Sequence, residues 1–291
     1  FSDCYALERV VLPDGLVSIE REAFKYCSRL SSINIPESIE YISSSAFDDC
    51  NSLPIINNIR YADTYLIEPL DKTMSNYTIM EGTRQIASNA FEECKNMSAI
   101  NIPEGVLRIY DEAFSSCTAL LNITLPKSLK YLGSGVFQGC SALTSIELPG
   151  GLTNIRYDTF KDCSALTTIN IPTSVTSIED AFDGCTSLES ITIPESVTAI
   201  GDGAFARTGI TEITITPNMA NANTGKGLFK SCINLSKVII QEGVTMIPVA
   251  MFGGDSVGCD NLTSVTIPTS VKTIGDYAFQ SARSLRTIKL H

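Results

Sequence analysis

The chain has 291 residues, of which 44% are hydrophobic, and it carries a net charge of −11. The apolar fraction suits a folded core, and the acidic balance argues against a nucleic-acid phosphate backbone as a partner. No apolar run comes near the roughly 18 residues that a transmembrane helix needs, so the sequence predicts none.

The sequence repeats itself with a period of 23 residues. One unit, CKNMSAINIPEGVLRIYDEAFSSC, spans residues 94–117, where the last cysteine opens the next unit. All ten cysteines occupy one position of the unit, and all twelve phenylalanines occupy another. A fixed period of this size is typical of a solenoid, in which each coil buries its apolar face against its neighbours.

The predicted strand of each unit has the pattern Leu-x-x-Ile-x-Ile-Pro, as in Leu30, Ile33, Ile35 and Pro36. Alternating β-branched residues predict a half-buried strand, and the proline, which lacks an N–H, ends its hydrogen-bond ladder. The same strand is predicted over residues 120–125, 143–148, 188–193 and 262–267.

A return segment follows, with the pattern Val-x-x-Ile and then Ala-Phe. Val106 and Ile109 begin it in the unit above, and Ala113-Phe114 end it. We expect short extended or 3-10 structure here, with the phenylalanine ring filling the wide part of the coil.

Three segments break the period: residues 59–76, 216–228 and 253–258. The first suggests a small hairpin on the back of the solenoid. Insertions in solenoids collect on loops and are often functional. Apart from these, residues 1–291 predict a single solenoid of about 13 coils, truncated within a repeat at both ends, as expected for a piece of a longer protein.

The shared position of the cysteines predicts reduced thiols. In a stack of coils they form one column whose side chains point inward in parallel, which suits packing better than bridging. We expect them to serve as small buried apolar residues.

No catalytic arrangement is evident. The chain has one histidine, His291, at its C-terminal end, so a Ser-His-Asp or Cys-His site lacks its base. The carboxylates are scattered at predicted turns, and nothing suggests convergent metal ligands. The sequence therefore predicts a protein that is not an enzyme and has no metal or cofactor.

The exposed positions of the predicted strands form a candidate binding face, since strand side chains alternate between the two faces of a sheet. One interpretation is that Thr, Ser and Asn suit strands and keep the face soluble. The other is a hydrogen-bonding surface for a protein or a glycan, although the Tyr, Trp and Arg typical of binding hot spots are absent. The candidate residues are Asn101, Asn122, Thr124, Ser145, Glu147, Thr168, Asn170, Ser190, Thr192, Thr214 and Thr266.

The unit resembles a leucine-rich repeat, in the 23-residue form of BspA-like bacterial surface proteins. The pattern C-x-x-L-x-x-I-x-I-P-x-x-V-x-x-I-x-x-x-A-F carries the resemblance over nearly the whole chain. The resemblance implies a right-handed solenoid arc with a parallel β-sheet on its concave face. It also implies export to the cell surface or secretion, and a role in adhesion or protein binding.

These observations favour a non-catalytic interaction module whose partner is another protein, of the host or of a bacterial surface. A glycan-binding surface and a passive spacer for other domains are the alternatives. Neither nucleic acid nor membrane insertion is expected.

Overall fold

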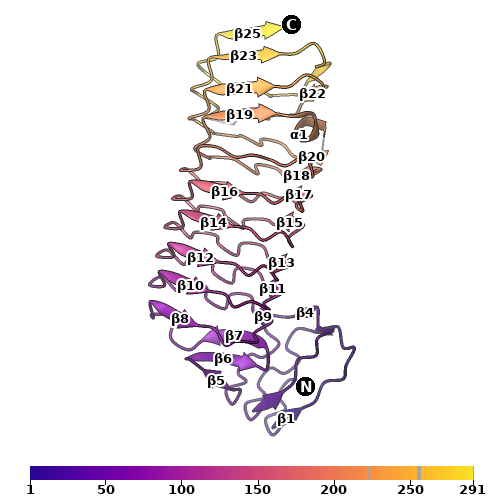
Figure 1. Ribbon diagram of the computed structural model, residues 1–291, viewed down its shortest axis with the longest axis vertical. Helices are drawn as coiled ribbons and strands as arrows, with labels where there is room; N and C mark the ends of the chain where they lie inside the picture. Colours follow the sequence, from indigo (N-terminus) through magenta and orange to yellow (C-terminus); the bar gives the residue numbers. More distant parts are fainter. Residues whose placement is uncertain (222, 254–256, 291) are drawn as a thin grey trace.

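The chain folds into a solenoid of stacked coils with almost no helix, as Figure 1 shows for this computed structural model. The structure describes residues 1–221, 223–253 and 257–290. Residues 222 and 254–256, which belong to two of the irregular segments, lie outside the described residues. No helix in the described ranges is long and apolar enough to span a membrane. The expected parallel-strand solenoid is confirmed.

Four of the five predicted strands lie in a first strand column, whereas residues 188–193, predicted as the fifth, form no strand. Partners are parallel and one repeat apart, so that Ala99 lies opposite Asn122. The middle residue of each three-residue strand points inward and its two neighbours point outward, as in β10 with its buried Ile100. The column consists of β1 (Arg9–Val10), β3 (Ser32–Ile33), β8 (Asn76–Thr78), β10 (Ala99–Asn101), β12 (Asn122–Thr124), β14 (Ser145–Glu147), β16 (Thr168–Asn170), β19 (Glu212–Ile215), β21 (Lys237–Ile240), β23 (Ser264–Ile267) and β25 (Thr287–Leu290).

The return segments are extended, and they pair with one another to form a second strand column. Each strand has only two residues, and the second is an isoleucine or leucine that points into the core in most coils. Its members are β2 (Ser18–Ile19), β4 (Tyr41–Ile42), β9 (Gln85–Ile86), β11 (Arg108–Ile109), β13 (Tyr131–Leu132), β15 (Asn154–Ile155), β17 (Ser177–Ile178), β18 (Ala199–Ile200), β20 (Asn223–Thr224), β22 (Met246–Ile247) and β24 (Thr273–Ile274). In segment 216–228, the short helix α1 (Pro217–Asn221) precedes β20.

The Ala-Phe turns form the third side of each coil. They make the most regular contacts between neighbouring coils. The Phe114 N–H donates to the Val136 carbonyl at 3.0 Å, and the Phe137 N–H to that of Thr159 at 2.9 Å. The Phe137 ring is fully buried and stacks between those of Phe114 and Phe160, with centroids 5.8 and 5.7 Å away. We call this stack of rings the Phe column.

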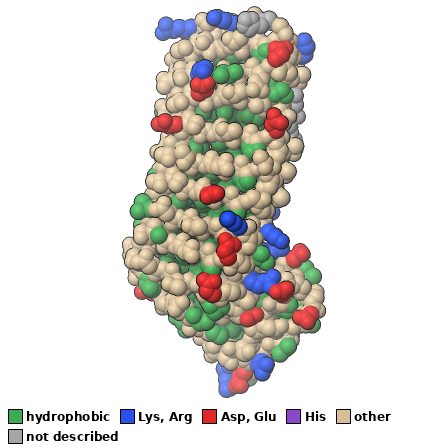
Figure 2. All heavy atoms as spheres, viewed as in Figure 1, with side chains coloured by type: hydrophobic (Ala, Val, Ile, Leu, Met, Phe, Trp, Pro, Cys, Tyr) green, Lys and Arg blue, Asp and Glu red, His purple; other side chains and the backbone are tan. Residues whose placement is uncertain are grey.

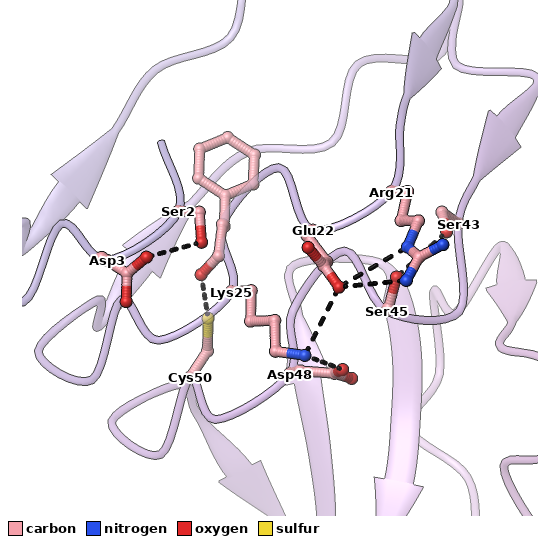
Figure 3. Close-up of polar contacts among 10 residues, drawn as sticks. Ser2, Asp3, Arg21, Glu22, Lys25, Ser43, Ser45, Asp48 and Cys50 are labelled. Atoms are coloured by element: carbon pink, nitrogen blue, oxygen red, sulfur yellow. Dashed lines mark hydrogen bonds and ion pairs between the residues drawn. The ribbon is translucent and has the colours of Figure 1, made fainter.

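The cysteine column lies beside the Phe column, and none of the ten thiols forms a disulfide. Nine of the ten are buried, and eight donate their S–H to the carbonyl of a phenylalanine in the preceding coil. Figure 3 shows this bond at Cys50, whose sulfur lies 3.0 Å from the Phe24 carbonyl oxygen. Nearby, Lys25 lies between the carboxylates of Glu22 and Asp48. The thiol thus acts as a small core residue with one donor.

The stack is interrupted once near its N-terminal end, in segment 59–76. Here β5 (Ile55–Ile56), β6 (Ile59–Ala62) and β7 (Tyr65–Pro69) pair antiparallel with one another. Asn57 and Asn58 both have positive φ, which permits the tight turn between β5 and β6. Strand β7 then pairs in parallel with β9, so the hairpin occupies a place in the second strand column.

The first two coils therefore attach to the rest by side chains. No backbone–backbone hydrogen bond joins residues 1–49 to residues 51–290 among the described residues. In Figure 1 these coils lie to one side of the axis of the stack. Gln85 Nε2 donates to the Ile39 carbonyl at 3.1 Å, and Arg84 forms an ion pair with Glu37. We call this contact the junction.

Candidate functional site

The predicted binding residues lie on the outer side of the first strand column, which we call the outer face. Ten of the eleven are exposed, and Thr214 is half-buried. Pairing places Asn101 beside Thr124, and Glu147 beside Asn170. The structure therefore brings most of these side chains together in rows along the stack.

The rows are less regular near the C-terminal end. Ser190 and Thr192 lie in a segment that forms no strand. Thr214 faces Ile239, which is 39% exposed and lies opposite Thr266 in the next coil. Sequence reasoning missed this apolar residue, although it occupies the same repeat position as the candidate polar residues.

The polar groups of the outer face make no hydrogen bonds to the residues that the structure describes. Within the described part of the chain, none of the eleven side chains is hydrogen-bonded to another protein group. The residues one position earlier in each repeat form a neighbouring row in which several hydroxyls do have protein partners. For example, Thr167 Oγ1 donates to the Thr144 carbonyl of the preceding coil at 3.1 Å. The hydroxyls of that row join coils, whereas those of the outer face remain available to water or a ligand.

A hollow of about 250 Å³ lies at one edge of the outer face. Thr124 and Glu147 line it together with Lys127 and Glu104. The Lys127 N–H donates to Glu104 Oε1 at 3.1 Å, which holds the two turns beside the hollow. Both signs of charge are thus present within reach of the candidate residues.

The second strand column carries aromatic and arginine side chains that sequence reasoning did not single out. Arg156 and Arg108 lie over the Tyr131 ring, 4.8 and 5.9 Å from its centroid. Tyr41 is 46% exposed and makes an edge contact with Tyr110. Burial raises the pKa of the Tyr131 hydroxyl. Comparing the residues on both sides of the core isoleucine or leucine in each return segment would have revealed this group.

A groove of about 640 Å³ lies farther along the second strand column, between Tyr157 and residues 224–226. The sequence signal for it is the one short interval between cysteines, 22 residues from Cys163 to Cys185. Asp180 lies at the edge of the groove. Its pKa is raised, mainly by burial and to a smaller extent by the neighbouring carboxylates of Asp183 and Asp158. No group of three or more His, Cys, Asp or Glu side chains in the described ranges is placed to hold a metal ion.

Figure 2 shows how charge is distributed over one side of the molecule. Charged side chains are sparse along the middle of the stack and more frequent around the N-terminal coils. A surface of uncharged polar groups favours many modest contacts over a few strong ion pairs.

Comparison with known proteins identifies the repeat. The model of the BspA-type leucine-rich repeat region matches in six copies, over residues 1–66, 70–182 and 179–286. The chain belongs to the BspA-type leucine-rich-repeat family. The resemblance seen in the sequence is thereby confirmed.

A solved structure of a bacterial leucine-rich repeat protein shares the fold. This BspA-type chain is 33% identical to a leucine-rich repeat protein from Bacteroides ovatus, over 98% of this chain and 67% of that one, with a TM-score of 0.64. It is 20% identical to a leucine-rich cell surface protein from Faecalibacterium prausnitzii, over 98% of this chain and 88% of that one, with a TM-score of 0.41. No curated protein matches. Proteins built from this repeat are generally interaction modules and not enzymes.

Proposed function

We propose that this BspA-type chain is a non-catalytic adhesion or protein-interaction module of a bacterial cell-surface or secreted protein. Its outer face contacts another protein. The observation that supports this best is the set of eleven side chains without protein partners, set beside a neighbouring row whose hydroxyls join the coils.

The face suits a large partner. It extends along the strand column, so a partner can make contacts on many coils at once, and stacked repeats create extended surfaces of this kind. The net charge of −11 favours a basic or neutral partner, whose association slows as salt is added.

The test is a pair of variants with similar changes in charge. Thr124, Ser145, Glu147 and Asn170 are replaced together by lysine, while the control carries Glu81→Lys and Glu195→Lys at exposed turns. A partner is first identified by cross-linking the parent protein at the surface of host or bacterial cells. Binding of that purified partner is then measured by surface plasmon resonance.

We expect the four-lysine variant to bind about tenfold or more weakly, since it changes the centre of the contact, and the control to bind as the parent does. If the four-lysine variant folds and binds normally while the control loses binding, the contact surface lies on the turns instead.

A further inference from the structure

The groove on the second strand column has a local cause in the sequence. The turn Ile178–Phe182 is one residue shorter than the equivalent turn Ile155–Phe160. In the next two coils the lining of the groove includes three small residues, Ala199, Gly201 and Gly225. A Cβ at Gly225 would clash with the backbone of Gly201 and Asp202, so the turns can stack this closely only with glycine.

Tyr157 forms one wall of the groove, and its ring is available to a ligand. The side chain is 58% exposed, and its ring contacts no other ring or cation in the part of the chain that the structure describes. Its backbone N–H donates to Glu179 Oε2 at 2.9 Å, which fixes the turn that carries the ring. The ring therefore presents a flat apolar face on a well-held backbone.

Hydrogen-bonding groups of both kinds surround this ring. Glu179 and Asp202 each use one carboxylate oxygen for a backbone N–H, of Tyr157 and Lys226 respectively, and have a second oxygen for another donor. Asp180 Oδ1 is buried at the edge of the groove without a hydrogen-bond partner. The Lys226 side chain adds a donor.

The groove continues around the corner of the solenoid. A second cavity of about 370 Å³ on the Ala-Phe side shares Asp180, Asp202 and Lys226 with it. Both cavities are open, so together they suit an elongated ligand that passes along several coils.

We propose that this groove binds a neutral, linear oligosaccharide. The C–H face of a pyranose ring packs against Tyr157, and its hydroxyls donate to Glu179 and Asp202. Carboxylates oppose an anionic ligand, and Lys226, which lines both cavities, opposes a cationic one. Uncharged hydroxyls can both donate to the carboxylates and accept from the lysine. This site is separate from the outer face, and the inference does not depend on the proposed protein contact.

The test uses the parent chain and three variants in native gels that contain soluble β-glucan, starch, mannan or xylan. Tyr157→Ala removes the ring, Tyr157→Phe keeps it, and Tyr5→Ala removes a tyrosine that is equally exposed, at 59%, on the first coil. Affinity for a hexasaccharide of the retarding polysaccharide is then measured by calorimetry, with hexalysine as the competing class of ligand.

We expect at least one polysaccharide to retard the parent, and Tyr157→Ala to weaken hexasaccharide binding about tenfold or more. Tyr157→Phe should bind within about twofold of the parent because it keeps the ring. Tyr5→Ala should do the same, since surface changes elsewhere have little effect. The four-lysine variant of the outer face should also bind the sugar normally, which separates this site from the proposed protein contact.

Three results would overturn the inference. The first is that no neutral polysaccharide retards the parent. The second is that Tyr157→Ala, shown by circular dichroism to be folded, binds the hexasaccharide as Tyr5→Ala does. The third is that hexalysine binds the groove and the sugars do not, which would make it a site for a basic protein segment.

Discussion

The regular stack and the junction join their coils in different ways. From Phe91 to Phe252, the phenylalanine of each coil donates its N–H to the following coil at 2.7–3.0 Å. The same bond joins Phe24 to Ala46 within the first two coils. Among the described residues Phe47 makes no such bond. Its ring stacks on that of Phe24 in the preceding coil, but it is tilted against Tyr65, and no phenylalanine of a following coil stacks on it. The ladder thus stops at the junction.

Particular side chains replace the ladder there. The Tyr110 hydroxyl lies 3.0 Å from the Glu40 carbonyl oxygen and 2.8 Å from Gln85 Oε1, and Asp63 Oδ2 accepts the Ile35 N–H at 2.9 Å. Backbone ladders use groups that every residue has, so they tolerate sequence change. The junction depends on individual side chains, and single substitutions should therefore affect it selectively.

The largest effect is expected in the regular stack. Phe137→Ala removes a fully buried ring between two stacked neighbours and should destabilise the chain by about 3–5 kcal/mol. Thr124→Ala, on the outer face, should change stability by no more than about 0.5 kcal/mol. Urea denaturation followed by circular dichroism measures both. Equal shifts of the midpoint would show that the assignment of core and surface is wrong.

A smaller and local effect is expected at the junction. Tyr110→Phe keeps the ring but leaves the Glu40 carbonyl and Gln85 Oε1 without their donor, at a cost of about 1–3 kcal/mol. Hydrogen exchange followed by mass spectrometry should show faster exchange in residues 1–49 and little change in residues 94–185.

The control for Tyr110 is Tyr131→Phe, since the half-buried Tyr131 makes ring contacts while its hydroxyl has no hydrogen bond to any residue that the structure describes. Exchange in residues 1–49 should stay as in the parent. If exchange in Tyr110→Phe rises evenly along the whole chain, the first two coils are not held independently by side chains.

The sequence predicts the regular stack well because one pattern recurs there. The burial of the isoleucines, phenylalanines and cysteines follows from a period of 23 residues. The pattern does not reveal that the Ala-Phe side carries the most continuous ladder. That ladder depends on positive φ at positions such as Glu112 and Ser116, which many residue types occupy in different coils.

The junction and the groove could not be deduced from the repeat. Contacts such as Tyr110 with Glu40 join residues 70 positions apart, and they arise only because the hairpin interrupts the stack. The groove results from one missing residue and from small residues that lie in the two following coils. The outer face was predictable as a surface, since strand alternation fixes which side chains point outward, but its role as a binding site is still a prediction.

The cysteine column runs through the first two coils and through the regular stack. Its thiols therefore allow the smallest predicted effect to be compared between these two regions. Burial raises the pKa of Cys50 to about 12, and those of Cys94 and Cys232 to about 11, above the ordinary value of 9.0. In the unfolded chain these thiols therefore ionise near pH 9.0, whereas in the folded chain they are still protonated at that pH. The stability that these thiols contribute is present below pH 9.0 and is lost as the pH rises toward 11–12.

We expect the urea midpoint to fall between pH 8 and pH 10.5 in a reducing buffer, and to fall less steeply in Cys94→Ala, which removes the first such thiol after the hairpin. Cys4→Ala is the matched control, because Cys4 is exposed and should leave the slope unchanged. A thiol reagent should label Cys4 alone in the folded protein and all ten cysteines in denaturant without reductant. Fewer than eight labelled thiols would mean that the column contains disulfides, and identical pH slopes for both variants would mean that Cys94 is not a buried thiol.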